Sequence, residues 1–364
     1  MVEFRRRAGA AETLRKAGVV GDVEDTDAPT PLLDQPPTTT GPEREFTVEA
    51  RSQVRTVLRR FFRHKLAVIS LAVLIVIFLF AFVGQHFWPY HYGTQYGEVG
   101  QVRGGGAIGG PTFSEPARCH GDYSQIIAQR FKDGPCAPHF FGSDGNGHDM
   151  VADTMRGSQI SLSIALMVAL LATSVGVVVG AIAGYYRGWV DAILMRGTDL
   201  FLTIPLVAVA GTLSVHVKGG SWWVLAIILA GLGWMPIARV IRGEFLSLRE
   251  KEFVEAARAM GASDRRIIFR HILPNVVGSI IVNATLVVAA AILLETALSY
   301  LGLGVKSPDT SLGLIISDNQ TAFQTRPWLF WIPGLFIVTI ALSINFIGDG
   351  LRDAFDPKQT RVRA

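Results

Sequence analysis

The chain contains two cysteines, Cys119 and Cys136, with three histidines near them in the sequence. Such groups could form a disulfide, remain as free thiols or, together with the imidazoles, bind a metal ion. The histidines are His120, His139 and His148, and their spacing from the cysteines matches no common zinc pattern. We therefore expect no metal site here. The choice between a disulfide and free thiols depends on the compartment that this segment occupies.

The sequence lacks the local motifs of common hydrolases and nucleotide-binding proteins. No glycine is followed directly by lysine, so a Walker A loop is absent. Neither His-Glu-x-x-His nor Gly-x-Ser-x-Gly occurs. The segment 144–149, Asp-Gly-Asn-Gly-His-Asp, is only loosely similar to a calcium-binding loop because its spacing differs and the closing glutamate is missing. We expect no catalytic site, no metal and no cofactor in this chain.

Three polar residues interrupt otherwise apolar stretches: Asp199, Asn283 and Glu295. An ionisable group inside a membrane is costly and normally faces either a water-filled path or a structural partner. Glu295 and Asp199 are therefore candidates for a pathway or gate, with a structural pair as the alternative. Arg196, one turn before Asp199, favours the structural pair for that residue. Asn283 is expected to form hydrogen bonds between helices.

Long apolar stretches carry these residues. Charged residues make up 18% of the 364 residues, whereas soluble domains average about 25%. Six stretches have the length of roughly 20 residues that a membrane-spanning helix needs. They are expected at 66–88, 160–186, 192–215, 222–241, 276–298 and 328–347. The composition excludes a soluble globular enzyme, and the small net charge of +4 argues against nucleic-acid binding. The sequence predicts an all-α polytopic membrane protein with six transmembrane helices.

Small residues and prolines mark where these spans should pack and bend. Small residues recur at every fourth position of the second span, at Ala172, Gly176, Gly180 and Gly184. Such a ridge allows close approach of another helix, which we expect within this chain first and in a partner subunit as the alternative. Pro205 and Pro236 are expected to kink the third and fourth spans, as fixed bends or as gating hinges.

Basic residues predict the orientation of the chain. With both termini in the cytoplasm, 26 Lys and Arg lie inside and 8 outside, as the positive-inside rule requires. The cluster next to the first span decides the orientation: Arg51, Arg55, Arg59, Arg60, Arg63 and Lys65. The segment 89–158 then lies outside the cytoplasm, where disulfides persist. We therefore predict a Cys119–Cys136 disulfide.

The remaining regions are assigned by composition. Residues 1–46 are rich in Asp, Pro and Thr and are expected to form a disordered cytoplasmic tail. Residues 47–65 are expected to form an amphipathic helix at the inner membrane surface. Its apolar face would consist of Val54, Val57, Leu58, Phe61 and Phe62. The first transmembrane helix at 66–88 and the loop 89–158 precede a core permease domain at 159–350, and residues 351–364 form a cytoplasmic tail.

The charged segment 242–275, between the fourth and fifth spans, is expected to contain two short helices. The first, at about 248–260, has an apolar stripe at helical spacing. This stripe consists of Phe253, Ala256, Ala257 and Met260. Gly261 would end the helix in the left-handed conformation. An amphipathic helical knob with small residues suits a groove in a partner protein, and a solvated helix pair is the alternative.

The second helix of this segment has its own start and stop signals. Ser263 is a suitable N-cap residue, and Asp264 follows it in the first turn. Arg270 and His271 would lie in the last turn, and Pro274 is expected to stop the helix.

The order Glu255-Ala256-Ala257, Gly261 and Pro274 resembles the EAA loop of ABC-importer membrane subunits. Further segments are similar to the C-type permeases of dipeptide and oligopeptide importers: 52–71, 141–149, 184–191, 299–305 and 345–353. Together they cover most of residues 50–357. The chain departs from the family pattern at His148, where arginine is usual, and in a long cysteine-bearing insertion at about 90–138.

The resemblance implies a type I ABC-importer permease with cytoplasmic coupling helices, in a bacterial inner membrane. It implies a homologous B-type permease, two ABC ATPase subunits that bind ATP and Mg, and an extracytoplasmic peptide-binding protein as partners, besides membrane lipid. The residues implied to couple to the ATPases are Glu255, Ala256, Ala257, Gly261, Ser263, Arg265 and Pro274.

Three alternatives to a peptide importer are an importer of other cargo, an ion-coupled secondary transporter and a membrane enzyme. The same family includes importers of nickel and other small cargo. An ion-coupled secondary transporter should show several midplane carboxylates and usually an internal repeat, and neither is apparent in the sequence. A membrane enzyme would need a catalytic constellation, which is also missing.

The predicted disulfide should be present in protein purified without reductant. We expect mass mapping of non-reduced peptides to show Cys119 joined to Cys136, and reduction to release both peptides. A loop of this length should stabilise the folded state by about 3 kcal/mol in the chain-entropy model. Two thiols that react with an alkylating reagent in oxidised protein would contradict the prediction.

Overall fold

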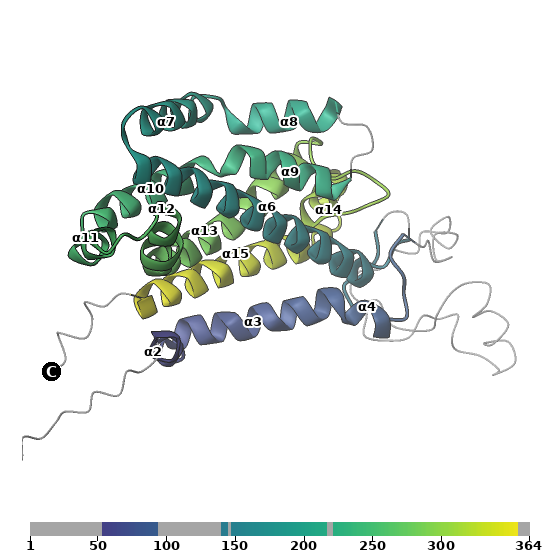
Figure 1. The fold of residues 1–364 in the computed structure, drawn as a ribbon. Helices are drawn as coiled ribbons and strands as arrows, with labels where there is room; N and C mark the ends of the chain where they lie inside the picture. Colours follow the sequence, from purple (N-terminus) through teal and green to yellow (C-terminus); the bar gives the residue numbers. More distant parts are fainter. Residues whose placement is uncertain (1–52, 94–139, 145–146, 217–220, 356–364) are drawn as a thin grey trace, which may run out of the picture. The chain divides into compact units, whose positions relative to one another are not determined.

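The computed structural model describes residues 53–93, 140–144, 147–216 and 221–355 (Figure 1). Among these residues the regular elements are helices, besides one isolated bridge between Ser143 and Asp149. The predicted tail at 1–46 and both cysteines lie outside the described residues, so the disulfide stays a prediction. Of the predicted tail at 351–364, residues 351–355 belong to the last helix and the rest lies outside the described residues.

The helices that could cross a membrane form one bundle (Figure 1). Its elements, in chain order, are α2 (Gln53–Phe61), α3 (Lys65–Phe82), α4 (Gly84–Phe87), α6 (Met150–Tyr186), α7 (Gly188–Leu202), α8 (Leu206–His216), α9 (Trp222–Gly233), α10 (Met235–Arg249), α11 (Glu252–Ala259), α12 (Asp264–Arg266), the π-helix η3 (Ile267–Ile272), α13 (Leu273–Tyr300), α14 (Leu312–Asp318), the 3-10 helix η4 (Gln320–Ala322) and α15 (Trp328–Phe355).

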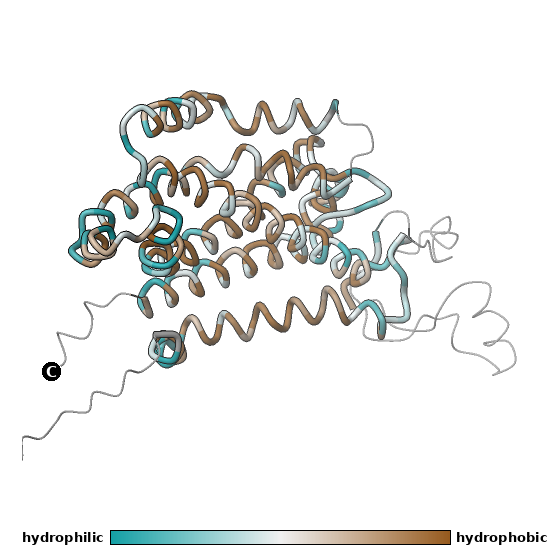
Figure 2. The backbone as a smooth tube through the Cα atoms, in the orientation of Figure 1, coloured by the Kyte–Doolittle hydropathy of each residue, from teal (hydrophilic) through white to brown (hydrophobic). Residues whose placement is uncertain are grey.

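Four continuous helices are long and apolar enough to span a membrane: α3, α6, the run from α12 to α13, and α15. Two further pairs pass the same test but are bent, α7–α8 by 77° and α9–α10 by 43°. Figure 2 shows apolar residues along all of these helices. The predicted all-α polytopic fold is confirmed, with six spans when each bent pair counts as one. The bends lie beside Pro205 and Pro236, as the sequence predicts.

The second span begins earlier than expected. Helix α6 starts at Met150, not at residue 160, and so includes part of the segment that the sequence assigned to the loop 89–158. Asp149 explains the early start, because its side chain accepts a hydrogen bond of 2.9 Å from the backbone nitrogen of Ala152 and caps the helix. Hydropathy alone missed this start because the first turns of α6 carry Asp153, Arg156 and Gln159.

The predicted amphipathic helix is α2, for the part that the structure describes. Phe61 is buried at 6% exposure and contacts α3 and α15 through Ala67 and Ala354. Leu58 and Phe62 remain more than half exposed. Of the expected apolar face, Phe61 therefore packs on the bundle, whereas Leu58 and Phe62 are exposed.

Helices α6 and α10 form the most extensive helix contact among the described elements. A Cβ atom on Gly180 would lie 2.5 Å from the Ala238 carbonyl oxygen, and one on Gly184 would lie 2.6 Å from Phe245 Cβ. Only glycine permits this separation. The small-residue ridge of the second span thus packs within the chain.

Replacing Gly180 by alanine should loosen this contact, because the added methyl group cannot avoid the α10 backbone. We expect a loss of about 1–3 kcal/mol, measured as a lower thermal unfolding midpoint of the detergent-solubilised protein. Gly231→Ala in α9 is the matched control, because nothing described lies within 4 Å of the added Cβ. Equal midpoints for the two variants would show that the approach of α6 to α10 is not constrained by Gly180.

Candidate functional site

Helix α11 is a short helix at one end of the bundle, between α10 and α12 (Figure 1). Its inner face consists of Val254 and Ala257, which are 0% and 2% exposed. Val254 belongs to a buried cluster that includes Tyr185 of α6, Phe245 of α10 and Ile267 of η3. The bundle therefore holds α11 through apolar contacts with several helices.

The outer face of α11 is open. Glu255 and Ala256 are exposed, Phe253 is 42% exposed, and Met260, just after the helix, is 81% exposed. The predicted stripe is therefore divided, since Ala257 points inward while Phe253, Ala256 and Met260 point outward. The expected helix at 248–260 is also two helices, because α10 runs to Arg249 and α11 begins at Glu252.

Gly261 ends α11 as the sequence predicts, with φ at +79°. Its backbone nitrogen donates to the Arg258 oxygen at 2.9 Å, and Ala262 nitrogen donates to the Ala257 oxygen at 3.0 Å. These two bonds form a Schellman motif. Ser263 occupies the N-cap position of α12, but its side chain makes no capping hydrogen bond. Arg265, in α12, is exposed.

The prediction that Pro274 stops a helix is wrong. The helix runs from Asp264 to Tyr300, and Pro274 lies in the first turn of α13. The π-helix η3 immediately precedes it, and the nitrogen of Leu273 donates to the Ile268 oxygen, five residues back. Proline lacks the N–H of a normal helical turn, and its ring clashes with the carbonyl four residues earlier. The wider π turn accommodates this change in hydrogen bonding without ending the helix.

Glu295 is completely buried and lies among hydroxyl groups. Ser161 of α6 donates to Oε2 at 3.0 Å, and Ser299 of α13 donates to Oε1 at 2.7 Å. The Ser161 hydroxyl accepts from the Leu312 nitrogen at 3.2 Å, and the Ser299 hydroxyl accepts from the Val305 nitrogen at 3.3 Å. This arrangement favours the structural alternative for Glu295, although its partners are serines and not an arginine.

The other two pathway candidates have local partners. Asp199 pairs with Arg239 of α10, and not with Arg196, and both side chains of the pair are more than half exposed. Asn283 donates to the Ser279 oxygen of its own helix at 2.8 Å, so the expected bond between helices is not the one observed. The structure therefore does not bring Glu295, Asp199 and Asn283 together as one site.

Further polar contacts join α6 and α7 to α10 and α12, near α11. Arg242 binds Asp191 through two hydrogen bonds of 2.5 and 2.6 Å. The Tyr185 hydroxyl donates to Asp264 Oδ1 at 2.6 Å. Arg187, at the end of α6, contacts Glu250, and its hydrogen bond and charge lower the pKa of the Glu250 carboxyl group. These contacts join α6 and α7 to the helices on either side of α11.

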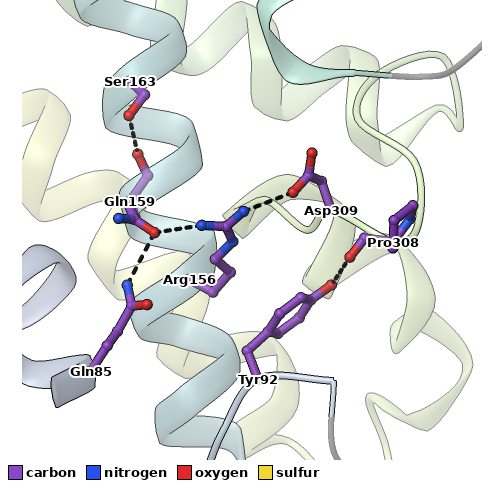
Figure 3. A network of polar contacts seen from close by, with 7 residues as sticks. All are labelled: Gln85, Tyr92, Arg156, Gln159, Ser163, Pro308 and Asp309. Carbon is purple, nitrogen blue, oxygen red and sulfur yellow. Dashed lines mark hydrogen bonds and ion pairs between the residues drawn. The ribbon is translucent and has the colours of Figure 1, made fainter. Parts of the chain in front are cut away.

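A polar network at the other end of the bundle was not predicted from the sequence (Figure 3). Arg156 binds Asp309 at 2.9 Å and donates to Gln159 Oε1 at 2.8 Å. Gln85 donates to the same Gln159 oxygen at 3.1 Å. These contacts link the first turns of α6 to α4 and to the segment between α13 and α14.

Tyr92 attaches the segment after α4 to the same network (Figure 3). Its hydroxyl donates to the Pro308 oxygen at 2.6 Å. Burial, followed by the charges of Asp153 and Asp309, raises the pKa of the Tyr92 phenol. The partners in these contacts are up to 216 positions apart, which is why no local pattern could reveal them.

The sequence matches two family models. Residues 176–361 match the binding-protein-dependent transport system inner membrane component. Residues 52–99 match the N-terminal TM domain of oligopeptide transport permease C.

Three relatives illustrate the extent of the similarity. The oligopeptide transport system permease protein OppC of Mycobacterium tuberculosis is 38% identical over 316 residues, which are 86% of this chain and 98% of the relative. The OppC proteins of Haemophilus influenzae and Escherichia coli K12 are each 36% identical over 314 residues, covering 86% of this chain and 91% and 94% of the relatives. Among solved structures, a chain of the inward-facing MetNI methionine ABC transporter aligns at 19% identity with a TM-score of 0.47, covering 57% of this chain and 98% of that chain.

The two family models cover the first span, the end of α6 and the chain from there through α11 to residue 361. The chain therefore belongs to the family of binding-protein-dependent transport system inner membrane components and is an integral membrane protein.

Proposed function

We propose that this chain is the C-type permease subunit of an ATP-driven ABC importer for peptides. Relatives named as oligopeptide transport permeases, which match nearly along their whole length, support peptide as the cargo. In this proposal the chain carries no catalysis of its own and encloses half of the translocation path with a B-type permease. Two ATPase subunits hold ATP and Mg, and an extracytoplasmic binding protein delivers the peptide.

The position of α11 is the observation that carries this proposal. Its inner face is fixed by Val254 and Ala257, while Phe253, Glu255 and Ala256 face outward with nothing described covering them. A short helix of this kind suits a groove on a partner protein. In this proposal the residues predicted for coupling, Glu255, Ala256 and Gly261, have two different roles. Glu255 and Ala256 touch the ATPase, and Gly261 sets the direction in which the chain leaves α11.

The proposed orientation places α11, α2 and the end of α15 on the cytoplasmic side, with both termini. These elements lie at the same end of the bundle (Figure 1). Arg59 and Arg63, at the end of α2, are exposed there, as the positive-inside rule expects. The network of Arg156, Asp309 and Tyr92 then lies on the outer side, where a binding protein would dock.

A tryptophan on the outer face of α11 should block ATPase binding. We expect Ala256→Trp to insert and fold normally, because Ala256 contacts nothing within the chain that it must displace. An overpacked contact costs about 1–3 kcal/mol, so ATPase retention on co-purification should fall by about ten- to a hundredfold. Thr321→Trp is the matched control, since Thr321 is exposed in η4, shortly after α14, and α14 lies at the opposite end of the bundle from α11 (Figure 1). Wild-type ATPase retention by Ala256→Trp would contradict the proposed docking face.

Substitutions at two further positions test how α11 is attached to its own bundle, separately from its contact with the ATPase. Ala257→Leu should displace α11 from its own bundle, because Ala257 is 2% exposed. Gly261→Pro removes the left-handed turn, whereas Gly261→Asn can keep it. We expect the leucine and proline variants to lose peptide uptake into proteoliposomes while still inserting into the membrane, and Gly261→Asn to retain most of it. Normal uptake by the proline variant would show that the turn is not needed for coupling.

The cargo can be tested with the assembled complex. Proteoliposomes are prepared with both permeases and the ATPases and are supplied with the binding protein. They should accumulate labelled short peptides only when ATP is present on the side of the membrane where the ATPases lie. Accumulation of nickel but no peptide would identify the alternative cargo. Uptake that needs an ion gradient and no ATP would contradict the proposed function as an ABC importer.

A further inference from the structure

Three side chains of the kind that bind metals meet at the head of α6. Asp144 and His148 lie in the loop before the helix, and Asp153 lies in its first turns. One ligand atom of each lies within 4.8 Å of those of the other two. The sequence predicted no metal here, because the spacing matched neither a zinc pattern nor a calcium loop.

The backbone of the loop fixes two of these side chains before any ion binds. Ser143 and Asp149 form an antiparallel bridge, and the Asp144 nitrogen donates to the His148 oxygen at 3.1 Å. The His148 nitrogen in turn donates to Asp144 Oδ1 at 2.8 Å. The two side chains are therefore held side by side, with His148 Nδ1 2.9 Å from Asp144 Oδ2.

The third side chain, Asp153, lies beside two other carboxylates and one imidazole. Asp153 interacts unfavourably with Asp144 and Asp149, and His148 is the group that interacts with it favourably. Arg156, one turn further along α6, is instead bonded to Asp309 and Gln159 (Figure 3). Asp144 is only 9% exposed. Buried carboxylates are stabilised by pairing, by protonation or by coordinating a metal ion, and a metal ion can be shared by all three side chains of this group.

We propose that Asp144, His148 and Asp153 bind one divalent transition-metal ion. An imidazole nitrogen with two carboxylates suits zinc or a neighbouring first-row ion, whereas calcium and magnesium take oxygen ligands alone. Three protein ligands and a water molecule complete a four-coordinate zinc site. Metal binding replaces the contact between His148 Nδ1 and Asp144 Oδ2. Small rotations of the three side chains bring the donor atoms to bonding distance.

The site goes beyond the proposed transport function, in which this chain holds no metal. An ion there would join the loop before α6 to α6 itself. The same loop includes Asp149, which caps α6 and accepts a hydrogen bond of 2.8 Å from the Trp88 indole. Metal binding would therefore stiffen the connection between the α4 region and the head of α6.

Zinc titration of the full-length chain in detergent tests this proposal. The chain should carry Cys119→Ser and Cys136→Ser, so that thiols cannot bind the ion. We expect calorimetry to show one zinc equivalent per chain, and cobalt substitution to give visible absorption bands. His148→Gln and Asp153→Asn should each weaken zinc binding by at least about tenfold, because each removes one of three ligands.

Matched substitutions distinguish the cluster from other surface groups. His86→Gln in α4 and Asp349→Asn in α15 replace the same residue types outside the cluster, and should leave zinc binding unchanged. Gel filtration and thermal unfolding without zinc establish that each variant is folded, and an unfolded Asp153→Asn leaves His148→Gln as the test. The proposal is overturned if the cysteine-free chain binds no zinc, or if both cluster variants bind it as tightly as the parent.

Discussion

The close approach of α6 to α10 is the contact on which the arrangement of the bundle depends. Gly176, Gly180 and Gly184 remove side chains from one face of α6, so the α10 backbone can lie against it. In a membrane, where lipid is as apolar as the helices, such packing is a main source of helix association. The end of α10 then determines where α11 begins, and the ion pair between Arg242 and Asp191 holds α7 to the same helix. The proposed coupling surface is therefore positioned in part by glycines that belong to α6 and not to α11.

A second anchor lies within the other half of the bundle. Glu295 and the serines around it connect α6, α13 and the start of α14 with hydrogen bonds that satisfy both carboxyl oxygens. A buried polar network of this kind is costly to break, because each separated group would be left without a partner. Helix α6 thus contacts α10 through glycines along one part of its length and α13 through a polar cluster along another. The long helix α6 therefore contacts both α10 and α13 and connects the two halves of the bundle.

The sequence was most informative where a local signal decides the structure. Gly261 predicted its own left-handed turn, and Pro205 and Pro236 predicted the bends beside them. Contacts between distant residues could not be predicted in this way. The partner of Asp199 proved to be Arg239 and not Arg196, since the fold and not the sequence spacing brings an arginine to it. Pro274 was misjudged because a π-helix can pass a proline that would end an ordinary α-helix. The sequence did not indicate that Asp153 lies next to Asp144 and His148, because the start of α6 was predicted too late.

The uninterrupted run from Asp264 to Tyr300 has a consequence for how force crosses the membrane. Its 37 residues correspond to a rod of about 55 Å, while the hydrocarbon layer is about 30 Å thick. Much of the rod must therefore project beyond the lipid, and its α12 end lies next to the helix proposed to meet the ATPase. Tilting such a rod by about 5° around its far end would move α12 by about 5 Å. If the proposed ATPase contact is correct, a small rotation at the α12 end would be transmitted to the opposite face of the bilayer through one continuous helix.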